Sequence, residues 1–339
     1  MEVGLSAVAL RAGVSPATAS NALSGARHVA EGTRRRVFEV AEELNYHPNL
    51  IARSLRRQET KTLALLVADI ANPYYPAFAR AVHDRVDAQG YVSLIGNTDG
   101  DPEAELRVLQ QMRSRGVDGV IMGTMALSPE KIRDVLGPVI PLVLLNGESL
   151  DSDGDEPRAF RADEVGTDDF IGIGEAVGYL QGKGAQDIAF ISGPVESRPG
   201  AGRLASFRTA MVSAGLSLEN EWVEHASAYT LDAGFDAAQR LLSRHKRPAA
   251  IMCANDLIAL GVLEAARDQD LRVPADLAVV GFDDIPTAKL VTPRLTTIIN
   301  PATLVGYACA DALMRRIEHP DLPFGHVSLP THLVVRASA

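Results

Sequence analysis

Residues 12–23 read AGVSPATASNAL and follow a short amphipathic repeat near the start of the chain. Apolar residues at helical spacing predict a helix over residues 5–12, and Gly13 supplies the turn after it. Ser15 suits a helix N-cap and Pro16 the first position of a second helix. We expect that helix to end at about residue 23, because the next two residues are Ser and Gly.

A third helix is predicted over residues 31–44, where one apolar stripe recurs at helical spacing: Val37, Val40, Ala41 and Leu44. Two helices joined by a tight turn and braced by a third are typical of a helix-turn-helix unit. In such a unit the second helix enters the major groove of DNA. The alternative is a small bundle of amphipathic helices with no partner.

The exposed face and N-terminal half of the second helix carry the DNA contacts that we predict: Ser15, Pro16, Ala17, Thr18, Ser20 and Asn21. The Asn21 amide suits a bidentate contact to adenine, whereas the hydroxyl groups suit phosphates. We also predict DNA contacts at His28 and Thr33.

Charge is unevenly distributed along the 339 residues, whose net charge is −10. Residues 1–60 hold eight arginines and six glutamates, so this segment is weakly basic and the remainder is acidic. A basic head on an acidic body fits a protein that touches phosphates with its head alone.

Several classes of protein do not fit this sequence. We find no apolar run of membrane-spanning length and no signal peptide, and therefore expect a cytoplasmic protein without a membrane partner. Cys253 and Cys309 stand apart from each other and from histidine clusters, so we expect neither a disulfide nor a metal site, and no cofactor. Sequence motifs of hydrolases, nucleotide-binding loops and zinc proteases are missing, so we do not expect an enzyme. Residues 172–178, GIGEAVG, imitate a dinucleotide fingerprint but fall inside a predicted helix.

After about residue 60, near-continuous apolar strands alternate with helical segments. This alternation predicts α/β architecture, with two doubly wound parallel sheets that form two lobes and an effector cleft between them. Strands are expected at 63–67, 91–96, 119–122, 139–145, 187–192, 249–253 and 277–281, with helices at about 76–89 and 102–115.

The chain resembles the lactose/galactose-repressor family along nearly its whole length. In the head, residues 12–23 carry the resemblance, followed by LNYHPN at 44–49 and ARSL at 52–55. In the body the matching motifs are DIANPYY (69–75), GNTDG (96–100), Gly193-Pro194 with Arg203, AND (254–256), VGFDD (280–284), LTTI (295–298) and LVVR (333–336).

This resemblance implies a particular domain organisation. An all-α helix-turn-helix headpiece is expected at 1–47, a hinge helix and linker at 48–60, and an effector-binding domain at 61–339, built like periplasmic sugar-binding proteins. We expect an N-lobe at about 61–162 and 293–322, and a C-lobe at about 163–292 and 323–339. In the family the hinge helix orders on operator DNA, and its leucine enters the minor groove. That residue is Leu55 here, with Ala52 beside it.

The sequence departs from the family pattern at two places in the head. Gly4 and Ala7 stand where the family usually has a threonine cap and an aspartate, which weakens the start of the first helix. Asn21 stands where many members carry arginine, so the base preference of the half-site differs.

By the same resemblance, the cleft holds a small effector. We expect contacts from Asn72, Tyr74, Tyr75, Asn146, Asp168, Arg203, Tyr229, Asn255, Asp283 and Asn300, the last at a hinge position. Tyrosine faces suit the C–H surfaces of a sugar, and the polar groups suit hydroxyls. The residues therefore favour a sugar or nucleoside over a free base. Simpler alternatives are a turn at Asn72, a cap at Asp283 and a core position for Tyr229.

We therefore predict a ligand-responsive repressor that binds a pseudo-palindromic operator as a homodimer. Effector binding is expected to close the cleft and change the affinity for DNA, in either direction. The alternative is a cytoplasmic protein that binds a sugar or nucleoside without acting on an operator.

Overall fold

The computed structural model describes residues 4–25, 27–46, 59–123, 127–145, 162–217 and 220–339. The chain divides into two compact units at the boundary between Thr60 and Lys61. We describe each unit by itself.

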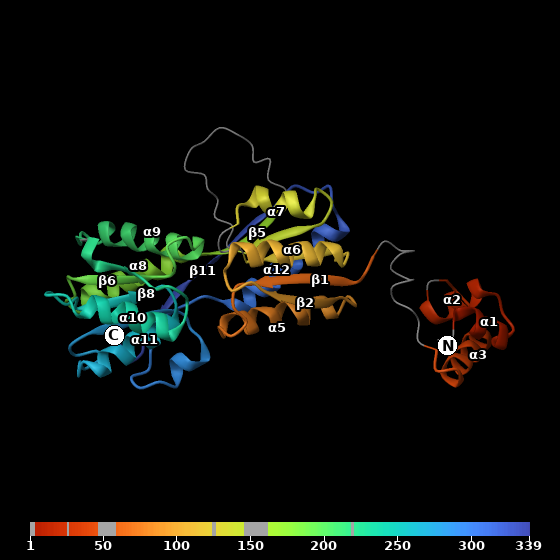
Figure 1. The fold of residues 1–339 in the computed structure, drawn as a ribbon, viewed down its shortest axis with the longest axis horizontal. Coiled ribbons are helices and arrows are strands. Elements are labelled where there is room, and N and C mark those ends of the chain that lie inside the picture. Colours follow the sequence, from red (N-terminus) through yellow and green to blue (C-terminus); the bar gives the residue numbers. More distant parts are fainter. Residues whose placement is uncertain (1–3, 26, 47–58, 124–126, 146–161, 218–219) are drawn as a thin grey trace. The chain divides into compact units, whose positions relative to one another are not determined.

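The first unit consists of three helices, α1 (Leu5–Ala12), α2 (Pro16–Ser24) and α3 (Glu31–Glu43) (Figure 1). The Ser15 hydroxyl accepts a hydrogen bond from the Thr18 backbone N–H at 3.1 Å and caps α2 as predicted. Gly13 and Gly25 end α1 and α2 with φ of 65° and 66°, values that glycine adopts readily. A core of small side chains holds the helices together: Val8, Ala9, Ala12, Ala19, Ala22, Val37, Val40 and Ala41.

The first lobe of the second unit is a six-stranded sheet in the order β11-β5-β4-β3-β1-β2. All of its recorded strand pairings are parallel. Its strands are β1 (Thr62–Val67), β2 (Val92–Asn97), β3 (Gly119–Met122), β4 (Leu142–Leu145), β5 (Asp163–Asp168) and β11 (His326–Pro330).

Helices cover both faces of this sheet (Figure 1). They are α5 (Tyr74–Asp87), α6 (Pro102–Ser114), α7 (Pro129–Leu136) and α12 (Ala302–Glu318). Leu63 and Leu65 of β1 join the core under α5 and α12, whereas Ala64 and Leu66 join the core under α6 and α7. Because successive side chains of a strand point to opposite faces, an unbroken apolar strand feeds both cores.

The second lobe repeats this plan, with a sheet in the order β12-β10-β9-β8-β6-β7. Among the described strands of this sheet, β12 pairs antiparallel with β10, and the other pairings are parallel. Its strands are β6 (Ile188–Ser192), β7 (Val223–His225), β8 (Ala250–Cys253), β9 (Ala278–Asp283), β10 (Thr296–Ile299) and β12 (His332–Val334). Its helices are α8 (Asp169–Gly182), α9 (Arg198–Ser213), α10 (Leu231–Leu242) and α11 (Asp256–Asp268), with 3-10 turns η1 (Asn220–Trp222) and η2 (Pro286–Lys289).

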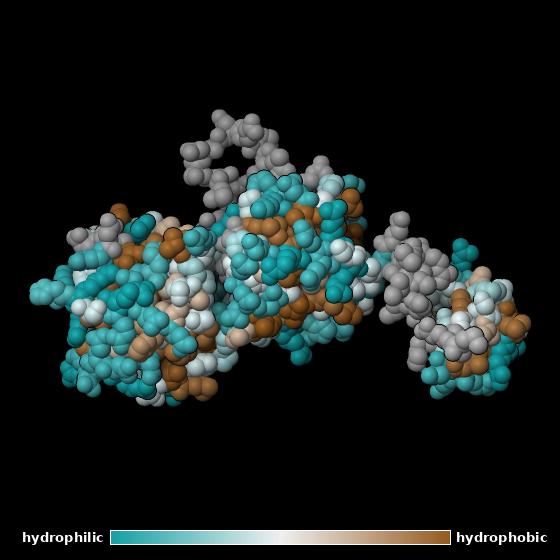
Figure 2. All heavy atoms as spheres, in the orientation of Figure 1, coloured by the Kyte–Doolittle hydropathy of each residue, from teal (hydrophilic) through white to brown (hydrophobic). Residues whose placement is uncertain are grey.

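The predicted fold class is confirmed: a helical head precedes two doubly wound α/β lobes. The apolar side chains lie mainly in the cores, and hydrophilic residues predominate on the visible face of the lobes (Figure 2).

The predicted lobe boundaries need correction. Strand β5 (163–168) and strand β11 (326–330) belong to the first lobe, although both ranges were expected in the C-lobe. Strand β10 (296–299) belongs to the second lobe, although residues 293–322 were expected in the N-lobe. A buried strand has the same apolar pattern in either sheet, so its hydrogen-bonding partner, and not its composition, decides its lobe.

The chain therefore crosses between the lobes at three places, between β5 and α8, between β10 and α12, and between β11 and β12. These crossings contain Asp169, Asn300 and Thr331. The Thr331 hydroxyl donates to the Asp168 carbonyl at 2.8 Å and accepts from the Gly172 N–H at 3.0 Å, so it ties two crossings together.

The GIGEAVG segment lies inside α8, as expected. A Cβ at Gly172 would lie 2.4 Å from Ile298 Cγ2 and 2.7 Å from the Thr331 hydroxyl. This glycine therefore allows close packing of α8 on the crossing strands. Helix packing accounts for the glycine, and nucleotide binding is not needed to explain the segment.

Candidate functional site

None of the six residues predicted to contact DNA on α2 and at its N-cap is fully buried in the first unit. Ser15, Pro16 and Ala17 are exposed, and Thr18, Ser20 and Asn21 are half-buried. Ala19 and Ala22 point into the core and so fix which face of α2 is free. His28 is exposed in the loop before α3, and Thr33 is half-buried in its first turn.

Two further observations concern the head. Arg34, Arg35 and Arg36 form an exposed basic run on α3, a feature that the sequence prediction left out although the run is plain in the sequence. Ala52 and Leu55, with most of the predicted hinge, lie outside the described residues.

The second unit holds a cavity of about 400 Å³ lined by residues of both lobes. Eight of the ten residues that we expected to contact the effector line this cavity: Asn72, Tyr74, Tyr75, Arg203, Tyr229, Asn255, Asp283 and Asn300. A cavity of this size matches the space that a small metabolite requires.

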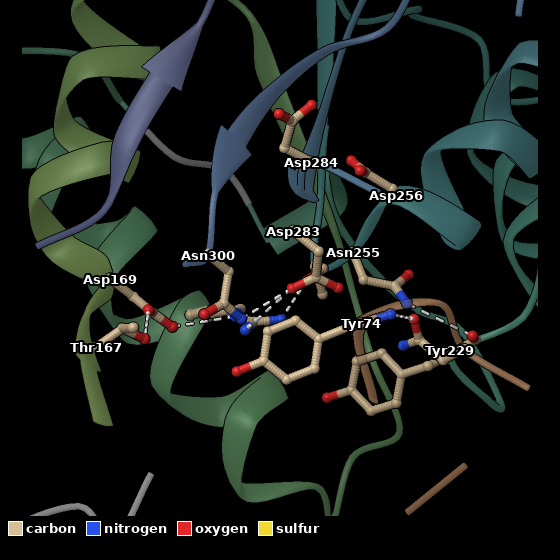
Figure 3. A network of polar contacts seen from close by, with 12 residues as sticks. Tyr74, Thr167, Asp169, Tyr229, Asn255, Asp256, Asp283, Asp284 and Asn300 are labelled. Carbon is tan, nitrogen blue, oxygen red and sulfur yellow. Dashed lines mark hydrogen bonds and ion pairs between the residues drawn. The ribbon is translucent and has the colours of Figure 1, made fainter. Parts of the chain in front are cut away.

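A buried ionic network forms one wall of the cavity (Figure 3). Arg203, on α9, donates through Nε to Asp169 Oδ2 at 3.0 Å and through Nη1 to the Ala254 carbonyl at 2.6 Å. Its Nη2 lies 3.8 Å from Asp283 Oδ1, and its guanidinium stacks 3.8 Å from the centre of the Phe282 ring. Burial opposes the charge of Arg203, but the two carboxylates outweigh it and raise the pKa of the guanidinium.

Asp283 lies at the end of β9, where it meets both the ionic network and a lobe crossing. Its Oδ1 accepts a hydrogen bond from Asn300 Nδ2 at 3.0 Å. Burial raises the pKa of Asp283 to about 6, against the opposing effects of Arg203 and Asn300. Its φ of 111° lies in a region that L-residues rarely adopt. Residues with such strained backbone conformations cluster at binding sites.

Asn255 and Asp256 begin α11 and have different tasks. Asn255 Oδ1 accepts from the Ile258 N–H at 2.9 Å and caps the helix, and the side chain also lines the cavity. Asp256 points away from Tyr74 and Asn300 (Figure 3). It accepts hydrogen bonds from the Thr297 hydroxyl at 2.5 Å and the Ile285 N–H at 2.8 Å. Asp256 therefore fixes the strands behind the site, and its burial raises its pKa well above the ordinary value.

Three tyrosines give the cavity flat apolar faces. The rings of Tyr74 and Tyr75 pack edge to face, with centroids 5.3 Å apart. Asn72 Oδ1 accepts from the Tyr74 N–H at 3.1 Å, so the turn that we considered as an alternative for Asn72 exists and places Tyr74 at the cavity.

Tyr229 enters from the second lobe, and glycines make room for it. Its hydroxyl lies 2.6 Å from the Ser197 hydroxyl, at the start of α9. A Cβ at Gly193 would lie 2.3 Å from Tyr229 Cζ, and one at Gly200 would lie 3.0 Å from the Tyr229 hydroxyl. The ring is thus held as a fixed wall of the cavity.

Two buried polar atoms of the cavity residues have no hydrogen-bond partner among the described residues: the Tyr74 hydroxyl and Asn300 Oδ1. Buried polar groups are usually satisfied, so these two atoms, which are shut off from solvent, are exceptions on residues that line the cavity.

Asp168 is a correction to the predicted site. It does not line the cavity, because its Oδ1 accepts from the Phe170 N–H at 3.2 Å and caps α8. The neighbouring Asp169 reaches Arg203 instead. Asn146 lies outside the described residues. The prediction also missed cavity residues close to motifs that it used: Asp69, Asp99, Glu196, Ser197 and Thr230.

Neither a metal centre nor a membrane span is found in the part of the chain that the structure describes. Its His, Cys, Asp and Glu side chains form no group of three that could hold a metal ion. Its helices are too short or too polar to cross a bilayer.

Both units match models of known protein families. Residues 5–49 match the model described as bacterial regulatory proteins, lacI family, and residues 177–339 match that of a periplasmic binding protein-like domain. The chain is 34% identical to the ribose operon repressor of Escherichia coli, over 98% of each chain. It is also 34% identical to the HTH-type transcriptional repressor PurR of Salmonella newport, over 98% of this chain and 95% of that repressor.

Solved structures agree with these matches. The Lac repressor dimer bound to operator and the anti-inducer ONPF aligns with a TM-score of 0.86 and 26% identity, over 100% of this chain and 99% of that one. A LacI family transcriptional regulator from Enterococcus faecium with bound ribose aligns with a TM-score of 0.71 and 26% identity, over 82% of this chain and 98% of that one.

Proposed function

This chain belongs to the lacI family of bacterial regulatory proteins, and we propose that it represses transcription under the control of a small ligand. The ligand occupies the cavity between the lobes. Two chains bind a pseudo-palindromic operator as a dimer, with α2 of each head in one half-site. The function is binding and not catalysis, and it is exerted at the chromosome, in the cytoplasm.

The observation that carries this proposal is a cavity lined by both lobes, in which three tyrosines stand beside the Arg203–Asp283 network. The tyrosine rings offer apolar faces, and Arg203, Asn255 and Asp283 offer polar groups in fixed positions. Alternating apolar C–H surface and hydroxyl groups in a sugar complement this arrangement.

A sugar is therefore our first candidate for the effector, and ribose is the first compound to test. One relative is named as a ribose operon repressor, and one structural neighbour contains bound ribose. A purine or nucleoside is the second candidate, since a PurR repressor is equally similar to this chain.

We propose that the effector acts through the three lobe crossings. Asp169 and Asn300 lie on two of them, and each bonds to a cavity residue, Arg203 or Asp283. A ligand that engages Arg203 and Asp283 together with Tyr74 draws the two lobes together and biases the crossings toward one arrangement.

The remaining parts follow the family plan. The headpiece covers residues 1–47, the hinge residues 48–60 and the effector domain residues 61–339. In the hinge, Leu55 and Ala52 enter the minor groove, where an apolar wedge bends the duplex.

The test is a selection of operator sequences from random palindromes, followed by titration of the bound DNA at several salt concentrations. We expect a salt-dependent complex whose stability changes when ribose or another member of a sugar and nucleoside panel is added. Ligand binding without any DNA complex would favour a binding protein that does not act on an operator.

A further inference from the structure

The charge of the cavity sets a condition on the ligand. Of the described residues that line it, four carry carboxylates and one carries a positive charge: Asp69, Asp99, Glu196 and Asp283, against Arg203. The cavity is therefore strongly acidic when it is empty.

The positive charge of Arg203 is already balanced within the protein. Its Nε lies 3.0 Å from Asp169 Oδ2 and its Nη2 lies 3.8 Å from Asp283 Oδ1. The Arg203 and Asp283 side chains are 6% and 5% exposed, so neither solvent nor salt screens this pairing strongly. An anionic ligand group would have to compete with two fixed carboxylates for this guanidinium.

Carboxylates also stand at the entrance, and they come from both lobes. Asp99 and Glu196 are exposed and Asp69 is half-buried. In the first lobe, Asp69 Oδ1 accepts from the Ala71 N–H at 2.8 Å, and Asp99 Oδ1 accepts from Asn97 Nδ2 at 2.5 Å. These bonds hold both carboxylates in place, so a ligand that enters meets negative potential on either side.

The uncharged polar side chains that line the cavity are amides and hydroxyls, among them Asn72, Asn255 and Ser197. Such groups can donate to and accept from the hydroxyls of a polyol, and they add no positive charge that would attract an anion.

We propose that the effector site accepts uncharged or amine-bearing polyols and rejects their phosphorylated and carboxylated forms. This inference rests on the proposed function and names the ligand class of the same site. Its consequence is that the reaction which phosphorylates the effector also ends its signal, so the protein reads the pool of ligand before that step.

The test is titration calorimetry of the full chain with matched compounds: D-ribose with D-ribose 5-phosphate, D-glucose and D-glucosamine with D-glucose 6-phosphate, and adenosine with its 5′-monophosphate. For every neutral compound that binds, we expect the phosphorylated partner to bind at least about tenfold more weakly, since the carboxylates that line the cavity repel its phosphate. A phosphorylated compound that binds as tightly as its neutral partner, or more tightly, overturns the inference.

A variant separates charge from shape. Asp69→Asn, Asp99→Asn and Glu196→Gln together keep acceptor oxygens at the entrance and remove three charges. At low salt this triple variant should bring the affinities of the neutral and phosphorylated compounds several-fold closer. A control with three exposed carboxylates outside the cavity removed (Asp134→Asn, Asp268→Asn and Glu318→Gln) should keep the original ratio.

The outcomes distinguish the two proposals. An unchanged ratio in the entrance variant overturns the charge inference and leaves the proposed repressor function standing. Failure of every compound in the panel to bind the unmodified protein instead overturns the proposed sugar or nucleoside effector, and the charge inference falls with it.

Discussion

Arg203 and Asp169 form an ion pair, with Nε and Oδ2 3.0 Å apart, that joins a cavity wall to a lobe crossing. Arg203 comes from the second turn of α9, whereas Asp169 is the first residue after β5 leaves the first lobe. The side chains are 6% and 18% exposed, so the pair is largely shielded from water. The pair therefore connects a residue that lines the cavity to a segment that crosses between the lobes.

Removing Asp169 should cost both stability and ligand affinity. Asp169→Ala leaves a buried guanidinium with Asp283 as its remaining carboxylate partner, and we expect a loss of about 2–3 kcal/mol in the free energy of unfolding. Asp168→Ala, beside it, removes only a helix cap and should cost about 1 kcal/mol. Urea denaturation measures the free energy of unfolding of the two variants. Equal losses would show that the Arg203–Asp169 ion pair does not stabilise the fold more than a helix cap does.

Asp283 should make stability depend on pH. Its folded-state pKa of about 6 lies above the ordinary value, so the fold disfavours its ionised form. The resulting stabilisation is fully present below about pH 4 and is lost as the pH rises through about 6, an effect of the order of 3 kcal/mol. We expect the unliganded protein to gain stability relative to Asp283→Asn as the pH falls from 7 to 4. Denaturation at several pH values tests this, and a difference that stays flat with pH contradicts it.

The same ionisation should govern ligand binding. A sugar hydroxyl donates to ionised Asp283, and protonation below about pH 6 replaces that charged acceptor with a weaker neutral one. Effector affinity should therefore fall as the pH drops from 7 to 5 in the unmodified protein. In Asp283→Asn the affinity should be lower at pH 7 and vary little with pH. Calorimetry at each pH provides the measurement, and a parallel pH dependence in both proteins would assign the effect to another group.

Gly193 should be essential for the cavity and not for the fold of the head. A Cβ there would lie 2.3 Å from Tyr229 Cζ, so Gly193→Ala must displace the tyrosine wall. We expect at least about tenfold weaker effector binding, because displaced contacts are felt in a well-packed site. Gly174→Ala, a helical position with no atom within 4 Å of the added Cβ, is the matched control and should bind normally. Unchanged effector affinity in Gly193→Ala would mean that Tyr229 does not contact the ligand.

In the head, Asn21→Ala should weaken binding to the selected operator by about 1–3 kcal/mol and leave binding to random DNA nearly unchanged. Asn21 is half-buried on α2, next to the buried Ala22. Leu10→Ala, at a position 84% exposed on α1, serves as a control that should retain operator affinity. Fluorescence anisotropy measures the affinity for both DNAs. An equal loss of affinity for the operator and for random DNA would assign Asn21 to phosphate contacts.

Local features of the fold could be predicted from the sequence because their causes are local. The Ser15 cap, the glycine ends of α1 and α2, and the apolar strand β3 depend on neighbouring residues. The lobe that receives β5, β10 or β11 depends instead on hydrogen bonds between segments far apart in the chain. Composition does not contain that information, and so the predicted lobe boundaries were wrong.

The candidate site likewise has features with local causes, which the sequence predicts, and features that depend on distant segments. The residue types near Asp283 and Arg203 were predicted by motif, and the structure brings them together. Whether Asp168 or Asp169 reaches Arg203 depends on where β5 ends and α8 begins, which is a difference of one residue in the chain. The space that Gly193 leaves for Tyr229 joins positions 36 residues apart, and only the folded chain reveals it.

We expect cavity occupancy and operator binding to share one free energy of coupling. The most direct test measures both affinities in the same protein: the factor by which the effector changes the dissociation constant for operator DNA, and the factor by which operator DNA changes that for the effector. The two factors should be equal, and Asp283→Ala should keep its affinity for DNA but lose the response at effector concentrations that saturate the unmodified protein. A full response in Asp283→Ala at normal effector concentration, or an effector that binds without changing operator affinity at all, would contradict it.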